Sequence, residues 1–554
     1  MIRAGFSAAL LFLAAAGAPA QQHADLIVVN ARIWTGDAAA PEAEALAVSG
    51  ERIIAIGTTA AIRAHAAATT RVIDAEGRRI VPGFNDAHWH LPSRRTADLA
   101  DAGNPAEIQA RLKAFARSLP ASAWITGRGW KPTDFPGNQA HKRYLDEIFA
   151  DRPVLITDRD GHQALANSRA LSLASVTHAT PDPANGRIDR DATGEATGLL
   201  KEDAASIVRR LLPAQTAGEI FAALLAEIDK AASFGLTSLQ IASGTRPESL
   251  EFAAYRRLRD TNAMKARLRL SVPFARDITA PRLAEFAALA KTSDAWLAFG
   301  IAKGMLDGTV DAHTAAMIDP YANSTDLGIP MWPRDLLNHV TAAYDRGGLQ
   351  IELHAIGDRA IRLALDAFEF AARANGTSGR RHRVEHVEVP ALDDLPRFAA
   401  LGVIASTQAI FALPDDTTLN NYAPALGPDR ASRAVAFKLL DDAGAAQAFG
   451  SDYPVFPMDP LRGIHAAVTR ETPDGTPKGG WYPEHRLTVE RALRHYTYGS
   501  AFASFEEHQK GTLAAGRLAD FVMLSHDILT GPPSTLLEAK VLLTVAGGRT
   551  TYQR

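Results

Sequence analysis

Two histidines that alternate at the end of an apolar run are the strongest chemical signal in the sequence. Asp86-Ala87-His88-Trp89-His90 follows the run at residues 80–84. Alternate residues of a strand point to the same side, so the two imidazoles could bind one metal ion. A lone His-x-His pair is weak evidence, because this spacing also occurs by chance in packed or exposed segments. The metal interpretation therefore depends on further ligands elsewhere in the chain.

Three more candidate ligands lie at the ends of other apolar runs. His354 ends the run at 351–354, His386 lies within 384–387, and Asp452 closes 448–452. Each of them alone is more often a residue of the core or of a loop. If the runs are parallel strands of one barrel, all three residues face its C-terminal mouth, where one metal site could collect them. Together with His88 and His90 they favour a metal site.

Lys303 is an unusual member of this set, because it is embedded in the apolar segment 299–308. A buried ammonium group beside two metal cations would be strongly disfavoured. Carboxylation of its amine by carbon dioxide would turn it into an anionic ligand that bridges two ions. The alternative is a lysine that points outward or pairs with Asp307.

These residues need a scaffold that brings distant segments together. Short apolar runs alternate with helical segments, which is typical of parallel α/β folds. The sequence therefore predicts the fold class α/β, with a (β/α)8 TIM barrel over residues 81–509 and an insertion at about 93–230 that covers the barrel mouth. The eight expected strands lie within residues 80–88, 235–243, 267–274, 297–306, 349–357, 382–389, 403–411 and 446–455.

The sequence pattern at both ends of the chain differs from that of the expected barrel. Residues 21–80 and 510–554 consist of short β-rich pieces separated by Gly and Asp turns. Neither end could bury a sheet face alone. We expect the two ends to pair into one small β-sandwich domain.

The first twenty residues resemble a secretory signal peptide. Arg3 precedes an apolar run at 6–16, and Ala18 and Ala20 form an A-x-A pattern. The alternative is a short membrane anchor, although the run is well short of the roughly 20 residues that span a bilayer. We expect cleavage after residue 20 and a mature protein in the periplasm, with no membrane partner after cleavage.

The composition excludes several classes of function. The 554 residues include 59 Lys and Arg against 62 Asp and Glu, a formal net charge of -3. This balance argues against a broadly cationic nucleic-acid binder. The chain contains no cysteine, which excludes thiol nucleophiles, disulfides and thiolate metal sites. Any metal must be bound by His, Asp, Glu or a modified Lys.

The combination of motifs resembles the metal-dependent amidohydrolase superfamily, specifically its amidohydrolase-3 branch of YtcJ-like hydrolases, which includes N-substituted formamide deformylase. The resemblance extends over nearly the whole chain after residue 20. It departs from the family pattern at Lys131 and at Gln408-Ala409, two segments expected in pocket walls, which affects substrate identity and not metal chemistry. The matching segments are Pro82-Gly83-Phe84 with His88 and His90, Gly127-Arg128-Gly129-Trp130, Asp160-Gly161-His162, Lys303 with Asp307-Gly308, His354-Ala355-Ile356-Gly357-Asp358, Arg383-Val384-Glu385-His386, Gly450-Ser451-Asp452 and Gly516-Arg517-Leu518-Ala519-Asp520.

This resemblance implies roles for the candidate residues. The barrel would hold one or two divalent ions, usually zinc, with His88 and His90 on the buried ion. His354 and His386 would serve the second ion, and carboxylated Lys303 would bridge the pair. Asp452 would contact the metal and the attacking water, first accepting a proton and then donating it to the leaving nitrogen.

His162, on the insertion, is a second catalytic candidate. Related chains have a histidine there, and over the barrel mouth it could donate a hydrogen bond to the substrate carbonyl. The alternative is a loop histidine that holds the insertion together.

The function expected is hydrolysis of an amide-type C–N bond of a small molecule, such as a linear or cyclic amide or an N-acyl or N-formyl compound. Deaminases of this superfamily commonly have a Glu shortly after the fifth-strand histidine, whereas here Ala355-Ile356-Gly357-Asp358 follows His354. Ester or lactone hydrolysis and a non-catalytic regulatory role remain as alternatives. Dimers are common among such barrels, so a homodimer also stays open.

Overall fold

The computed structural model describes residues 23–554 apart from residues 93, 377 and 378. The expected signal peptide lies outside the described residues. Among the residues that are described, no helix is both long and apolar enough to cross a membrane.

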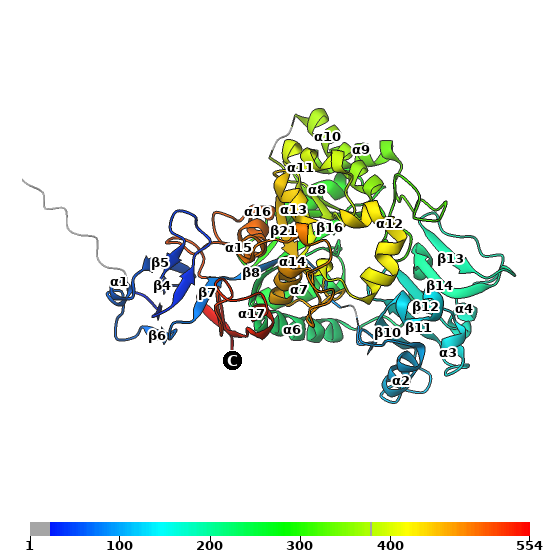
Figure 1. Ribbon diagram of the computed structural model, residues 1–554, viewed down its shortest axis with the longest axis horizontal. Coiled ribbons are helices and arrows are strands. Elements are labelled where there is room, and N and C mark those ends of the chain that lie inside the picture. The colour runs from blue at the N-terminus through cyan, green and yellow to red at the C-terminus, as the bar shows by residue number, and fades with distance from the viewer. Residues whose placement is uncertain (1–22, 93, 377–378) are drawn as a thin grey trace, which may run out of the picture.

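Eight parallel strands form the central sheet, as the sequence predicts for a TIM barrel (Figure 1). The first and last strands meet at the barrel mouth, where Asp452 N–H donates to His88 O at 2.8 Å and His90 N–H donates to Tyr453 O at 2.9 Å. In sheet order the strands are β8 (Phe84–Trp89), β15 (Leu236–Ile241), β16 (Arg267–Pro273), β17 (Leu297–Met305), β18 (Gln350–Ala355), β19 (Arg383–His386), β20 (Ile404–Gln408) and β21 (Ala446–Gly450).

Amphipathic helices connect the strands and cover the barrel. The helix α10 (Asp358–Asn375) illustrates why they form: Ile361, Leu365 and Phe368 recur on one buried face, and Gly376 ends the helix with a φ of 62°. The other helices that follow barrel strands or precede the next one are α6 (Ala217–Ser233), α7 (Leu250–Asp260), α8 (Ala280–Ala290), α9 (Arg334–Arg346), α11 (Leu395–Leu401), α12 (Ala423–Ser432), α13 (Phe437–Asp442), α14 (Pro460–Thr469), α15 (Val489–Arg494) and α16 (Ser500–Ala503).

The first expected strand, residues 80–88, is divided in the structure. β7 (Arg79–Pro82) belongs to a separate mixed sheet, and the barrel strand β8 starts only after Gly83. Gly83 N–H donates to Asp520 O at 2.9 Å, and a Cβ at this position would collide with the Thr237 side chain. Glycine therefore lets the chain pass from one sheet into the other, which the apolar pattern alone does not indicate.

The two ends of the chain pack together at one end of the molecule, where Figure 1 shows the blue N-terminal and red C-terminal strands side by side. A shared apolar core joins their two sheets, with Leu26 and Leu46 from one sheet and Phe521 and Leu543 from the other. One sheet contains β5 (Arg52–Gly57), β4 (Ala45–Ser49), β1 (Leu26–Val29) and β6 (Arg71–Asp74). The other contains β24 (Arg549–Gln553), β23 (Val541–Ala546), β22 (Phe521–Leu524), β7, β2 (Arg32–Trp34) and β3 (Glu42–Ala43).

The insertion after β8 forms a fourth sheet, at the opposite end of the molecule from the paired chain ends (Figure 1). Its strands end at Glu202, and α6 packs against the barrel strand β15. The predicted boundary at about residue 230 is therefore too far along the chain, because α6 already belongs to the barrel. The insertion contains β9 (Ala97–Asp98), β10 (Ile125–Trp130), β11 (Val154–Asp158), β12 (Gln163–Ala166), β13 (Gly186–Arg190) and β14 (Ala196–Glu202), with α2 (Pro105–Ala116), α3 (Arg143–Asp146), α4 (Ser168–Leu173) and α5 (Asp203–Arg209).

Candidate metal centre and active site

Three donor atoms converge where the barrel closes. His88 Nε2 and His90 Nε2 lie 3.2 Å apart, and Asp452 Oδ1 lies 3.1 Å from His90 Nε2 and 3.5 Å from His88 Nε2. All three donors lie within 4.8 Å of one another, the spacing of groups that could share one ion. Two imidazoles and a carboxylate are ordinary ligands of zinc and related divalent ions.

Hydrogen bonds at the far side of each ring explain why these nitrogens face one another. His88 Nδ1 lies 2.6 Å from Glu385 Oε2, and His90 Nδ1 lies 3.0 Å from Ser243 Oγ. A proton on each Nδ1 leaves two Nε2 lone pairs aimed at each other, an arrangement that a cation between them would stabilise. The donor set therefore fits a divalent metal ion.

Burial keeps three of the histidines neutral. Loss of solvent contact is the main reason that the pKa values of His88, His354 and His386 lie well below the usual range for histidine. Neutral imidazole is the form that coordinates a metal.

Glu385 and Arg383 form the support beneath His88. Both side chains are fully buried inside the barrel, and Arg383 Nε lies 2.9 Å from Glu385 Oε1. The guanidinium also donates to Gln240 Oε1 at 2.7 Å, to Ser406 Oγ at 2.9 Å and to Ala87 O at 2.6 Å. A charged network of this kind fixes the orientation of the ring that depends on it.

Asp86 ties the first strand to the last. Its carboxylate accepts hydrogen bonds from Ser451 N–H at 2.9 Å, from Ser451 Oγ at 2.5 Å and from His88 N–H at 3.1 Å. Burial raises the pKa of Asp86 to about 7 despite these bonds. Asp452, the next residue after Ser451, has a φ of 55°, a strained value for a residue other than glycine. The Asp86 contacts therefore help to hold Asp452 beside the two histidines.

The remaining expected ligands lie next to this centre but do not all point into it. Lys303 Nζ is 3.4 Å from His88 Nε2, inside the barrel, so the side chain does not point outward, which was one of the two alternatives to a metal ligand. His386 Nδ1 lies 2.8 Å from Gln408 Oε1 and 3.9 Å from Asp452 Oδ2. His354 Nε2 donates to Gly308 O at 3.3 Å. In this arrangement these three side chains do not form a second set of converging donors.

His162 reaches the barrel mouth from the insertion. Its ring centre lies 5.1 Å from that of His354, and its Nδ1 lies 2.8 Å from Glu202 Oε2. Burial favours the neutral ring, but Glu202, Asp158 and Asp160 outweigh burial and raise the pKa of His162 to about 9. The ring therefore carries a proton at neutral pH, with Nε2 available as a donor.

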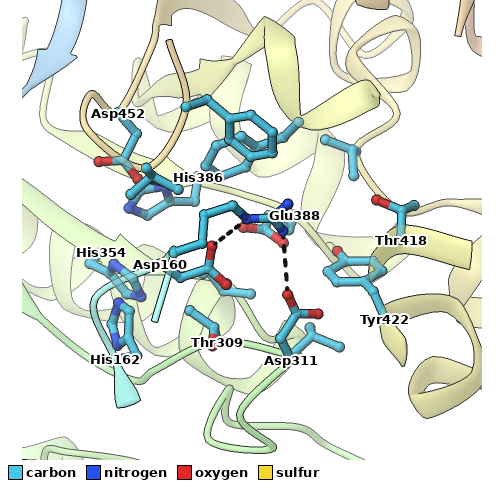
Figure 2. A pocket seen from close by; sticks show the side chains of 17 residues that line it. Asp160, His162, Thr309, Asp311, His354, His386, Glu388, Thr418, Tyr422 and Asp452 are labelled. Atoms are coloured by element: carbon cyan, nitrogen blue, oxygen red, sulfur yellow. Dashed lines mark hydrogen bonds and ion pairs between the residues drawn. The ribbon is translucent and has the colours of Figure 1, made fainter. Parts of the chain in front are cut away.

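A pocket opens beside these groups, and the empty space within it, counted together with solvent at its open mouth, is about 590 Å³ (Figure 2). Asp452, His386, His354 and His162 line one part of it, and Phe411 stacks on His386 with ring centres 6.2 Å apart. The other lining residues are Arg159, Asp160, Thr309, Val310, Asp311, Ile356, Glu388, Thr418, Tyr422, Val435, Val455 and Phe456.

The sequence patterns did not indicate roles for four supporting residues of the site, namely Glu385, Arg383, Ser243 and Glu202. A signal for the first two was present: charged residues at alternate positions of an apolar strand point to the same side as each other, into the barrel. Ser243 and Glu202 had no comparable signal, because each meets its histidine only through the tertiary fold.

A parallel eight-stranded barrel that presents histidines and an aspartate to a pocket at the carboxyl ends of its strands is the arrangement of a metal-dependent hydrolase. Residues 71–552 match the family described as "Amidohydrolase family", and the chain belongs to this family.

The chain is also similar to individual proteins and to solved structures. The chain is 32% identical over 549 residues to Protein LONG AFTER FAR-RED 3 of Arabidopsis thaliana, with 96% of this chain and 92% of the relative covered. It is 28% identical over 561 residues to N-substituted formamide deformylase of Arthrobacter pascens, with 96% and 99% covered. The crystal structure of an uncharacterized metal-dependent hydrolase from Pyrococcus horikoshii OT3 superposes with a TM-score of 0.71 at 25% identity, with 92% and 99% covered.

Proposed function

We propose that this metal-dependent hydrolase cleaves an amide-type C–N bond of a small molecule. The observation that carries the proposal is the position of Asp452, which contacts both histidines of the donor set and also lines the pocket. A carboxylate there can exchange protons with a water at the metal centre and with a substrate in the pocket. The name of the Arthrobacter relative, a formamide deformylase, supports a C–N bond as the target.

The metal would be bound by His88, His90 and Asp452, and we propose Zn²⁺. Such an ion supplies a water of lowered pKa and polarises the carbonyl of the substrate. We also propose that Lys303 is carboxylated: its neutral amine adds to carbon dioxide, and one proton leaves as the carbamate forms. Burial lowers the pKa of Lys303, which favours the neutral amine that this reaction needs.

Asp452 and His162 have different roles in the proposed reaction. Asp452 accepts a proton from the attacking water and donates it to the leaving nitrogen, because an amine leaves poorly until it is protonated. His162, protonated and bonded to Glu202, donates a hydrogen bond to the carbonyl oxygen as negative charge develops on it.

We further propose that the protein acts in the periplasm after removal of residues 1–20. Its partner there would be the small-molecule substrate alone, with neither nucleic acid nor a membrane. N-terminal sequencing of the secreted protein would test this, and an intact Met1 in the mature protein would contradict it.

The reaction is tested with Asp452→Asn on matched amide and activated ester substrates of the same acyl group. The variant keeps the shape and one oxygen donor but loses the basic carboxylate, so amide turnover should fall by about 100-fold or more. The leaving group of the activated ester departs without a proton, so ester turnover should fall less than amide turnover. Asp319→Asn, which removes an exposed carboxylate, is the control.

Two results would oppose this assignment. Amide turnover near that of the wild type would remove Asp452 from the mechanism. Equal losses on the amide and on the ester, with unchanged metal content, would limit Asp452 to activating the water.

A further inference from the structure

The part of the pocket away from the metal centre is rich in carboxylates. Figure 2 shows Asp311 and Tyr422 on the side opposite His354 and Asp452, with Asp160 and Glu388 between them. Arg159 is the one lysine or arginine among the lining residues of this described pocket. A substrate that fills the pocket must therefore place its remote end among acidic groups.

Arg159 already forms ion pairs with neighbouring carboxylates. Its guanidinium lies 2.6 Å from Asp415 Oδ2, 3.2 Å from Asp160 Oδ1 and 3.6 Å from Asp311 Oδ2. A substrate carboxylate would have to displace one of these partners and would meet the others at close range. Arg159 thus helps to hold the acidic wall together and does not offer a free anion site.

Two carboxylates on this wall have binding capacity left. Glu388 is only 7% exposed, and burial raises its pKa to about 8 although the neighbouring Tyr422 phenol opposes this shift, so a cation beside it would stabilise the ionised form. Within the described part of the chain, no cationic side chain forms an ion pair with it. The Asp311 side chain is 6% exposed, and its Oδ1 makes no hydrogen bond. A buried carboxylate oxygen without a donor is costly, and such groups are usually paired or bind a ligand.

We infer that the substrate carries an organic cation, such as an ammonium or guanidinium group, at the end remote from the scissile bond, and that Glu388 and Asp311 bind this cation. This inference rests on the proposed function. Guanidinium and ammonium groups supply the N–H donors that the two carboxylates lack.

The rest of the pocket suits the spacer between the two ends of such a substrate. Val310, Ile356, Phe411, Val455 and Phe456 line it with apolar surface. A hydrocarbon chain can lie against these walls while its charged end reaches the acids.

The inference is tested first with substrates that differ only in the remote group. N-acetyl and N-formyl derivatives of a four-carbon amine would carry a terminal guanidinium, hydroxyl or carboxylate, and a second series would carry the same groups on the acyl side. In one of the two series, kcat/KM for the guanidinium compound should exceed that of the hydroxyl compound by about tenfold or more. The carboxylate compound should be the poorest substrate.

Variants connect this preference with the two acids. Glu388→Gln and Asp311→Asn keep the side-chain volume and should each reduce the preference for the guanidinium over the hydroxyl compound by about tenfold, with a smaller change for the hydroxyl compound itself. Asp319→Asn changes the net charge equally at an exposed site and should leave the preference unchanged.

A binding measurement separates failure of this inference from failure of the proposed function. Calorimetric titration of the metal-loaded protein with butylguanidinium and with its uncharged isostere butylurea needs no turnover. Tighter binding of butylguanidinium that Glu388→Gln abolishes would support the cation site even if no amide is hydrolysed. Amide turnover with no preference for the charged compounds in either series, or equal binding of the two probes, would overturn the inference and leave the hydrolase proposal intact.

Discussion

Glu385→Gln should weaken metal binding although Glu385 does not belong to the donor set. The wild-type carboxylate lies 2.6 Å from His88 Nδ1 inside a fully buried environment. Glutamine keeps the shape and an oxygen acceptor but removes the negative charge that makes His88 Nε2 a better ligand. Loss of such a supporting group typically lowers metal affinity by about 10- to 100-fold, or about 1.4–2.7 kcal/mol.

The same substitution should also destabilise the metal-free protein, because Arg383 loses the carboxylate 2.9 Å from its Nε. Breaking a buried ion pair costs about 3–5 kcal/mol, and we expect the lower end of this range because Glu352 remains 3.5 Å from Arg383 Nη1. Two effects of different origin are therefore expected from one change.

The two effects are measured separately. Competition with a chelator gives the metal affinity, and denaturant unfolding of the metal-free protein gives the free energy of unfolding. Glu195→Gln, at an exposed position of the insertion, should change neither quantity. An unchanged metal affinity in a less stable protein would mean that Glu385 serves only Arg383. If neither quantity changes, the Glu385 carboxylate supports neither His88 nor Arg383.

Three further outcomes are expected. His88→Ala combined with His90→Ala should lower the metal content of the purified protein well below that of the wild type, as measured by elemental analysis, and equal stoichiometry would contradict the site. Lys303→Ala should lose activity and regain part of it with high concentrations of short-chain carboxylates; an experimental structure of the active protein that shows an unmodified ammonium at Lys303 would contradict carboxylation. Burial alone would raise the pKa of Glu506, but Lys510 at 2.9 Å and nearby Arg269 outweigh it and lower that pKa to about 2. The ionised pair therefore stabilises the protein above the unfolded pKa of about 4.5, and this stability is lost as the pH falls toward 2. In Glu506→Gln, the free energy of unfolding of the metal-free protein should therefore fall less steeply between pH 4.5 and 2.

Local patterns in the sequence were sufficient to predict the scaffold. Each barrel strand is a short apolar run between helical segments, and burial on both faces of a parallel strand requires this pattern. The alternation of His88 and His90 likewise depends only on the two-residue repeat of a strand, which brings both rings to the same donor set.

Tertiary structure alone decided how these residues are oriented and what surrounds them. The division at Gly83 depends on contact with Thr237, more than 150 residues away, and the His162–Glu202 pair depends on how two insertion strands are paired. The acidic wall joins Asp160 of the insertion to Asp311 and Glu388 of the barrel. No local sequence pattern predicts these contacts, because they depend on how segments far apart in the chain pack together. The sequence by itself therefore determined the barrel and the alternation that brings His88 and His90 to one candidate donor set. The network that supports these residues and the carboxylates of the pocket required the folded molecule.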